Sequence, residues 1–498
     1  MTTQSRLTEE KLSLSDLESL LWKAADILRG AVRPEKYGDY MLPLLFYKRL
    51  SDVWIEEYEQ AIKKYKNQEA AKQRFVHRFT IPNGCFWNDI RKETKNVGQK
   101  LNNTLEKIVK SNSELENVLN RTDFNKQEEI PQDRLIKLVE HFSQFKVGNQ
   151  NVSADMLGNA YEYLLKQFNE LAPQRAGEFY TPREVIKVMV EILNPSEGDE
   201  VYDPCCGSGG MLIVSHDHLI EKSKDPDKLF LYGQEINPDT WAIAKMNVAL
   251  HDLEAEISHG DTLADPKFLE GALLKKFDIA VANPMWNQDG YREVIQNDRL
   301  NRFGYGIPPN GAADWGWIQH MLTSLKSDGR MGIVLDQGAL FRGGAEVEIR
   351  QKIIEEDLVE CVVGLPEKIF YNTGAPGCLI FLNKTKTAES KSKILFIWAA
   401  KGFEKLKNMN KLRDESIEKI VDVHTQFTTI PKYSRLVSLD EIKENGHNLS
   451  IARYVDVSDE EERVDVSQVW IELKNLETER QEAESKLVSY LKELGYER

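Results

Sequence analysis

The stretch Glu200-Val-Tyr-Asp203-Pro-Cys-Cys-Gly207-Ser-Gly209-Gly210-Met-Leu-Ile-Val decides the fold, because a short apolar strand passes here through a glycine-rich turn into a helix. Glycine lets the backbone approach a ligand without a Cβ in the way, and the first turn of the next helix presents unpaired N–H groups. A glycine-rich loop alone is more often a structural tight turn. Between a strand and a helix, however, it predicts a ligand-binding turn of a parallel α/β sheet.

Short apolar runs of the same kind alternate with amphipathic helices from about residue 151, as in parallel sheets. We predict strands at Glu200–Tyr202, Phe230–Gln234, Glu256–His259, Ile279–Ala282, Met331–Leu335, Leu358–Gly364 and Cys378–Leu382, with one further candidate at Ile394–Trp398. The expected fold is therefore α/β, a doubly wound, mostly parallel, seven-stranded Rossmann-like sheet over residues 151–430.

Residues 1–150 precede the sheet and predict a helical domain. Ser15 and Glu18 have the spacing of a capping box before an apolar-periodic helix that stops at Gly30. A second amphipathic run covers about 40–65, where Pro43 is tolerable only near the first turn. The polar segment 121–133 is the best candidate for a mobile loop.

Residues 431–498 form a C-terminal segment that ends in a predicted helix. Its last thirty residues place long or apolar side chains alternately four and three apart, at Val469, Leu473, Leu476, Arg480, Ala483, Leu487, Tyr490 and Leu494. This rhythm fits equally a helix packed on its own domain and a coiled coil that binds a partner.

Composition narrows the class of protein. The five cysteines form neither a disulfide framework nor a CxxC metal motif, and His216 with His218 is expected to be an exposed helical pair rather than a metal site. No run is apolar enough to span a membrane, so the cytoplasm is expected. The net charge of −15 argues against tight unaided DNA binding, so that either DNA is not the substrate or a partner holds it.

The acidic residues around the glycine-rich loop indicate which cofactor it binds. Glu235 ends the next apolar run, where it can accept both hydroxyls of a ribose. It follows the loop at more than the roughly 20 residues of a dinucleotide fingerprint, and no GxxxxGK[ST] phosphate loop occurs. Asp203 suits an ammonium group, and Asp261, at the end of another strand, an adenine amino group. A ligand with a cationic amine, a nucleoside and no phosphate is expected, and S-adenosylmethionine fits.

The motif Asn283-Pro284-Met285-Trp286 follows the predicted strand that ends at Ala282. Asn-Pro after a strand is usually a turn, but at the carboxyl end of a strand beside a cofactor it becomes a candidate active site. The Asn283 side chain and the Pro284 carbonyl could accept both N–H groups of an aromatic amine, while Trp286 offers a stacking face for a flipped base. The following segment, 287–310, is expected to order over the target strand.

The ordered series Gly177-Glu-Phe-Tyr-Thr181-Pro182, DPCCGSGG, Glu235, Asp261 and NPMW resembles the amino-methyltransferases that act on adenine N6. The stretches SLSDLESLLWKAADILRGAV, YGDYMLPLLFYKRLSDVW, DMLGNAYEYLLKQF and GLPEKIFYNTGAPGCLIFLNK look like those of type I modification subunits. The resemblance covers essentially the whole chain.

That resemblance implies direct transfer of a methyl group from S-adenosylmethionine to a flipped adenine, with Asn283, Pro284 and Trp286 at the target base. The implied cofactor-binding residues are Gly177, Glu178, Phe179, Tyr180, Thr181, Pro182, Asp203, Cys205, Gly207, Ser208, Gly209, Glu235, Ile236, Asp261, Thr262 and Asn283. The usual family motif is NPPF or NPPY. Trp286 keeps the stacking face, whereas Met285 in place of the second proline is expected to loosen the loop and affect the rate.

The resemblance also implies partners: double-stranded DNA, a specificity subunit shared by two modification subunits, and a restriction or motor subunit in the full complex. It favours the interpretation that the C-terminal helix binds a partner. Two alternatives stay open: a catalytically impaired assembly component, and a methyltransferase acting on the glutamine N5 of proteins.

Overall fold

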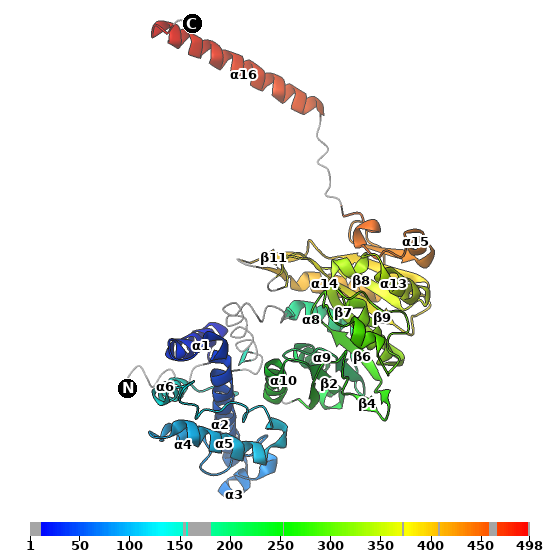
Figure 1. Ribbon diagram of the computed structural model, residues 1–498. Helices are drawn as coiled ribbons and strands as arrows, with labels where there is room; N and C mark the ends of the chain where they lie inside the picture. Colours follow the sequence, from blue (N-terminus) through cyan, green and yellow to red (C-terminus); the bar gives the residue numbers. More distant parts are fainter. Residues whose placement is uncertain are drawn as a thin grey trace. The chain divides into compact units, whose positions relative to one another are not determined.

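The computed structural model describes residues 11–152, 156–157, 181–251, 253–370, 373–406, 409–457 and 466–496 (Figure 1). Residues 1–455 form one compact unit and residues 456–498 form a second.

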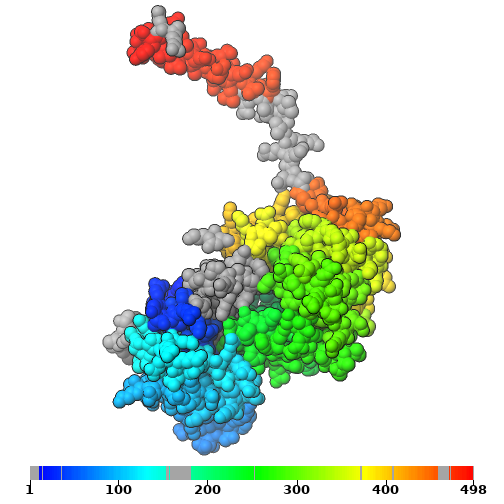
Figure 2. Space-filling view, in the orientation of Figure 1, coloured from blue at the N-terminus to red at the C-terminus, as the bar shows by residue number. Residues whose placement is uncertain are grey.

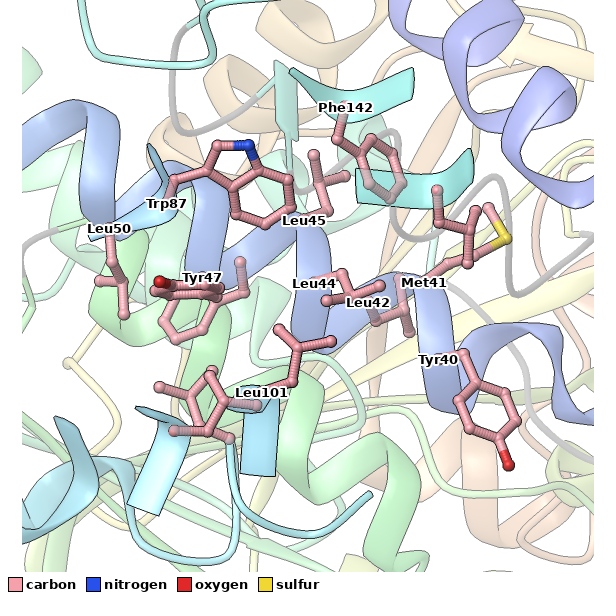
Figure 3. Close-up of a cluster of buried hydrophobic side chains, with 14 of the residues drawn as sticks. Tyr40, Met41, Leu42, Leu44, Leu45, Tyr47, Leu50, Trp87, Leu101 and Phe142 are labelled. Carbon is pink, nitrogen blue, oxygen red and sulfur yellow. The ribbon is translucent and has the colours of Figure 1, made fainter. Parts of the chain in front are cut away.

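The N-terminal region is helical, as predicted. Its helices are α1 (Leu14–Leu28), α2 (Tyr37–Tyr65), α3 (Gln68–Ala71), α4 (Trp87–Arg91), α5 (Val97–Ser111) and α6 (Gln132–Phe142), with short 3₁₀ turns at Pro34–Lys36, Arg74–Val76 and Ser113–Leu115. Apolar side chains of α2 pack against Trp87, Leu101 and Phe142 from α4, α5 and α6 in a buried core (Figure 3). Burial of such side chains, about 1.5–3 kcal/mol each, holds the bundle together.

The start of α1 differs from the expectation by two residues. Ser13, not Ser15, is the N-cap: its hydroxyl accepts the Asp16 amide at 3.2 Å, while the Asp16 carboxylate accepts the Ser13 amide at 2.8 Å. Both serines have an acid three residues on, so the capping-box spacing alone could not choose between them.

Pro43 lies within α2 and not in its first turn. Proline has no N–H, so the carbonyl of Asp39, four residues earlier, loses its helical partner. The Thr122 hydroxyl donates to that carbonyl at 2.7 Å. The segment 121–133, which we expected to be a mobile loop, also buries Phe124 and Ile130 completely, so it is a packed connection between α5 and α6.

The sheet has nine strands in the described chain, not the seven expected. They are β1 (Glu200–Asp203), β2 (Phe230–Glu235), β3 (Ala255–His259), β6 (Phe277–Ala282), β7 (Leu325–Asp336), β8 (Val359–Gly364), β9 (Gly377–Asn383), β10 (Lys393–Trp398) and β13 (Ser434–Ser438), in the order β13-β10-β8-β9-β7-β6-β1-β2-β3. All eight candidate strands are present. The ninth, β13, lies beyond residue 430 and pairs with β10.

The sheet is mixed and mostly parallel. β9 runs antiparallel to β7 and β8, and β13 antiparallel to β10, while the pairs from β7 through β6, β1 and β2 to β3 are parallel. Two small hairpins, β4 (Leu269–Glu270) with β5 (Leu273–Leu274) and β11 (Phe403–Lys405) with β12 (Asn410–Leu412), lie outside it. The central strands are almost wholly buried, as expected of a sheet covered on both faces.

Helices connect and cover the strands. They are α8 (Arg183–Leu193), α9 (Gly210–Glu221), α10 (Pro238–Leu250), α11 (Arg292–Gln296), α12 (Asp314–Thr323), α13 (Ala345–Glu355), α14 (Asp414–Gln426) and α15 (Leu439–Glu444), with 3₁₀ turns at Pro226–Lys228, Gln337–Leu340 and Ile451–Arg453. The chain order runs outward from β1 through β2 to β3 and then returns to β6 on the other side of β1. With right-handed crossovers, this reversal puts α9 and α10 on one face and α12 on the other.

The second unit contains one long helix, α16 (Val466–Glu493), drawn in red in Figures 1 and 2. Several large apolar side chains along it are exposed, among them Trp470, Ile471, Leu473, Leu476, Leu487, Val488, Tyr490 and Leu491. Within the described ranges, no helix is long and apolar enough to cross a membrane.

Candidate active site

The candidate residues meet where the strand order reverses. β6, β1, β2 and β3 are neighbours and run parallel, so their carboxyl ends share one edge of the sheet. Asp203 ends β1, Glu235 ends β2, Asp261 follows β3 and Asn283 follows β6. In open α/β sheets, ligands bind at such a switch point.

The glycine-rich loop folds against the end of β2. The amide of Cys206 donates to the Gln234 carbonyl at 2.9 Å, and that of Gly209 to the Cys206 carbonyl at 2.8 Å. Gly207 and Gly209 have φ of 55° and 85°, a conformation that favours glycine. A Cβ at Gly207 would meet no atom within 4 Å, so the loop faces open space at this point.

Glu235 is held at the mouth of this loop. One carboxylate oxygen accepts the Gly207 amide at 3.0 Å, and the other accepts the Asn237 amide at 2.7 Å. The side chain is nearly buried. The next residue, Ile236, is 54% exposed and offers an apolar surface beside the carboxylate.

Asp203 is an unusual acid because it is almost completely buried. Burial raises the pKa of its carboxyl to about 8; the nearby Glu235 carboxylate acts in the same direction, while a hydrogen bond from the Cys205 amide opposes the shift. A buried carboxyl without a cationic partner is disfavoured in its charged form. A cationic ligand at this place would restore the charge.

Asp261 and Thr262 tie the end of β3 to the rest of the site. One oxygen of Asp261 accepts the amides of Leu263 at 3.0 Å and Ala264 at 3.3 Å, and the other accepts the Tyr291 hydroxyl at 3.1 Å. Thr262 is buried, and its hydroxyl donates to the Pro204 carbonyl in the glycine-rich loop. The loops after β1 and β3 are thus directly bonded.

Asn283 is oriented by two neighbours. Its amide nitrogen donates to the Thr181 hydroxyl at 2.7 Å, and its carbonyl oxygen accepts the indole N–H of Trp286 at 3.3 Å. An indole N–H can only donate, so the oxygen of the amide must face it. The Asn283 backbone also forms a hydrogen bond with the half-buried thiol of Cys205, whose pKa is raised by desolvation.

The other three residues of the motif differ in their exposure to solvent. Pro284 is buried, Met285 is 41% exposed and Trp286 is half-buried. The Trp286 ring meets Phe370 edge to face, with ring centroids 5.0 Å apart. Met285 therefore points away from the packed side of the loop.

Most of the predicted site residues lie within the described chain and converge. Gly177, Glu178, Phe179 and Tyr180 fall outside the described residues, whereas Thr181 and Pro182, at the start of α8, are described. Sequence reasoning missed Phe370 and Tyr291. Two features of the sequence could have indicated them. Phe370 belongs to the stretch GLPEKIFYNTGAP, which carries part of the family resemblance, and Tyr291 lies in the segment after NPMW.

The two histidines of α9 are not part of this site. His216 and His218 are buried in α9, not exposed as expected, and His218 bonds to the Asn194 side chain at 2.9 Å. Among the described residues, no three His, Cys, Asp or Glu side chains form a group that could hold a metal ion.

A cavity of about 220 Å³ lies between α2, the segment 118–129 and α10. It contains none of the four strand-end residues. Four of its charged side chains form ion pairs, Lys36 with Glu129 at 2.7 Å and Arg121 with Asp239.

Comparison with known families gives two matches. The model described as N-6 DNA Methylase matches residues 152–463, and the model described as HsdM N-terminal domain matches residues 17–142. The first covers the sheet and its site, and the second covers the helical region.

Individual relatives agree with these matches. The chain is 36% identical to the type I restriction enzyme MjaVII methylase subunit of Methanocaldococcus jannaschii, over 94% of this chain and 82% of the relative. It is 32% identical to the HindI methylase subunit of Haemophilus influenzae, over 74% of this chain and 84% of that protein. The crystal structure of a type I restriction-modification methyltransferase subunit from Streptococcus thermophilus superposes with a TM-score of 0.75 at 29% identity, covering 89% of this chain and all of that one.

Proposed function

This chain belongs to the N-6 DNA methylase family as a type I restriction-modification methylase subunit, an adenine-specific DNA methyltransferase, and we propose that the strand-end site described above is its active centre. The observation that carries the proposal is the convergence of Asp203, Glu235, Asp261 and Asn283 at the carboxyl ends of four neighbouring strands. The family is one of S-adenosylmethionine-dependent methyltransferases.

We assign the cofactor to the loops after β1, β2 and β3. The residues fit it: Asp203 is a buried acid suited to the ammonium group, Glu235 presents a fixed carboxylate to the ribose, and the open space at Gly207 leaves room for the ligand. Asp261 and Ile236 would bind the adenine. The remaining assigned contacts are Gly177, Glu178, Phe179, Tyr180, Thr181, Pro182, Cys205, Ser208, Gly209, Thr262 and Asn283.

We assign the target adenine to Asn283, Pro284 and Trp286. A carbonyl oxygen has two lone pairs, so the Asn283 oxygen can accept an adenine N–H while it keeps the Trp286 indole. The Pro284 carbonyl would accept the second N–H. Trp286 would stack on the flipped base, an interaction worth about 1–3 kcal/mol.

When bound, the cofactor supplies the electrophilic methyl group. The chain itself holds the amine nitrogen in line with that group and concentrates its lone pair by accepting both N–H bonds. These are proximity and electrostatic effects, and no covalent intermediate on the protein is required.

The partners are also part of the proposal. An acidic chain with a net charge of −15 is poorly suited to hold DNA unaided, so we propose that a specificity subunit holds the duplex and joins two copies of this chain, with a restriction or motor subunit in the full complex. The exposed apolar side chains of α16 support a partner-binding helix. We propose three functional parts that act in the cytoplasm: a helical domain (1–150), a catalytic domain (151–430), and a C-terminal segment with a partner-binding helix (431–498), whose strand β13 completes the sheet of the catalytic domain.

Calorimetric titration with S-adenosylmethionine tests the cofactor assignment. Replacing Glu235 with Gln removes the charge that would bind the ribose hydroxyls and should weaken binding by about 10-fold or more, since hydrogen bonds to charged groups are worth about 1.5–3 kcal/mol. Glu256→Gln, an exposed position on β3, is the matched control and should bind normally. Unchanged affinity in Glu235→Gln would remove the cofactor from this site.

A further inference from the structure

We propose that Tyr291 is a positioning residue of the cofactor site: its hydroxyl orients the Asp261 carboxylate for the adenine of the cofactor. This inference rests on the proposed function, because it requires Asp261 to bind that adenine. Tyr291 lies in the segment that follows the Asn283–Trp286 motif, which we assign to the target base, yet it would act on the binding of the cofactor.

The segment from Trp286 to Tyr291 is fastened before it reaches Asp261. The Asn287 amide donates to the buried Asp314 carboxylate at 3.0 Å, and the Gly290 amide donates to the Asn310 carbonyl at 3.1 Å. Gln288 receives the Trp317 indole N–H on its side chain at 2.8 Å and an amide on its carbonyl at 2.9 Å. Tyr291 therefore starts from a fixed backbone, so its hydroxyl does not sit at the end of a loose loop.

Arg302 fixes the other end of the same segment. Its buried guanidinium donates to the carbonyls of Thr262 and Leu263 at 2.9 and 2.7 Å, next to Asp261 in the chain, and to the Asp298 carboxylate at 2.7 Å. The segment 291–302 is thus bonded to the loop after β3 at both ends, by Tyr291 and by Arg302.

The hydrogen bonds that the Asp261 carboxylate accepts indicate how the Tyr291 hydroxyl acts. A carboxylate offers about four lone-pair positions. The amides of Leu263 and Ala264 occupy one oxygen, and Tyr291 occupies one position on the other. The two sets of donors together fix the rotation of the carboxylate and leave the second oxygen with a position for the adenine amino group.

The bond also affects Tyr291. Burial, followed by the negative charge and the hydrogen bond of Asp261, raises the pKa of its phenol, so Tyr291 remains a neutral donor throughout the working pH range. A donor that cannot ionise can hold the carboxylate without repelling it.

The test is a double-mutant cycle on the full chain, with S-adenosylmethionine titrated calorimetrically. Tyr291→Phe should weaken binding about 3- to 10-fold, the worth of one hydrogen bond, and should raise the KM for the cofactor while kcat is retained. In an Asp261→Ala background the same change should have no further effect, because Tyr291 acts only through that carboxylate. Tyr305→Phe is the matched control, since it removes a hydroxyl that donates to the Glu356 carboxylate at 2.5 Å, and it should bind like the parent.

These measurements distinguish a failure of the inference about Tyr291 from a failure of the proposed cofactor site. Weaker binding in Asp261→Ala with no change in Tyr291→Phe would overturn the inference and leave the proposed function intact. Tighter binding in Tyr291→Phe would also overturn it, because the hydroxyl would then compete with the adenine. No change in either single variant would refute the role of Asp261 itself.

Discussion

At the scale of single residues, the exchange of the usual Phe or Tyr for Trp286 does more than preserve an aromatic face. Its indole N–H fixes the orientation of the Asn283 amide, which a phenylalanine could not do. Asn283, which we propose as the catalytic asparagine, is therefore held from two sides, by Thr181 and by Trp286.

The first prediction is that Trp286→Phe, although it restores a family-like residue, lowers the single-turnover rate of methyl transfer about 3- to 10-fold through loss of that hydrogen bond. Affinity for the cofactor should not change. Trp87→Phe, which removes an indole bond to Ser143 in the helical domain, is the control and should leave the rate unchanged. A Trp286→Phe variant as fast as the parent would refute the orienting role.

The second prediction concerns Asp203. With a pKa of about 8, its carboxyl is mostly protonated at pH 7 in the free protein, and a bound ammonium group would bring the pKa down. Binding of S-adenosylmethionine at pH 7 should therefore release a proton from the protein. Titrations in two buffers of different ionisation enthalpy measure this release, which should vanish in Asp203→Asn.

The same shift has a consequence for stability. A carboxyl whose folded-state pKa is raised stabilises the folded protein at low pH. This contribution is lost progressively as pH rises from the unfolded pKa of about 4 to the folded pKa of about 8. The melting temperature of Asp203→Asn minus that of the parent should thus grow from pH 5 to about pH 8. Asp328→Asn, at an exposed position on β7, is the control. A difference independent of pH would contradict the buried-acid account.

Sequence alone predicted that Asp203, Glu235, Asp261 and Asn283 lie at one edge of the sheet, because each stands at the end of a recognisable strand and parallel strands bring their carboxyl ends together. It could not find Phe370 or Tyr291, since their approach to the site depends on how distant segments pack.

At the scale of elements, the apolar runs predicted eight strands, because buried central strands must be apolar along most of their length. β13 escaped because it lies at the sheet edge and reads Ser-Arg-Leu-Val-Ser, with no continuous apolar run. The observed N-cap of α1 differs from the predicted one because two serines fit the same capping pattern, and only the folded backbone identifies Ser13 as the cap.

Pro43 and Thr122 give an element-scale prediction. Thr122→Val removes the donor to the Asp39 carbonyl and should lower the free energy of unfolding by about 1 kcal/mol. In a Pro43→Ala background, a restored helical N–H can satisfy the same carbonyl, so the cost of Thr122→Val should be smaller. Denaturant titration of the four chains measures the coupling. Equal costs in both backgrounds would mean that Thr122 does not compensate for the proline.

At the scale of the whole molecule, a catalytic unit is combined with a helix whose apolar side chains are exposed. Replacing Leu476 and Leu487 with Asp should weaken binding of the specificity subunit about 100-fold or more, since each buried leucine is worth about 1.5–3 kcal/mol. Cofactor affinity should be unaffected. Glu479→Gln on the same helix is the control, and normal co-purification of the double aspartate variant would exclude α16 from the interface.

The most direct test of the account is transfer of a labelled methyl group from S-adenosylmethionine to DNA by the chain co-expressed with its specificity subunit. The parent and Asn103→Ala, an exposed asparagine of α5, should label adenine N6. Asn283→Ala should still bind the cofactor, about 3- to 10-fold more weakly through loss of its assigned contact, and should label nothing above background. Full labelling by Asn283→Ala would contradict the proposed active centre, and cofactor binding without transfer by the parent would favour an impaired assembly component.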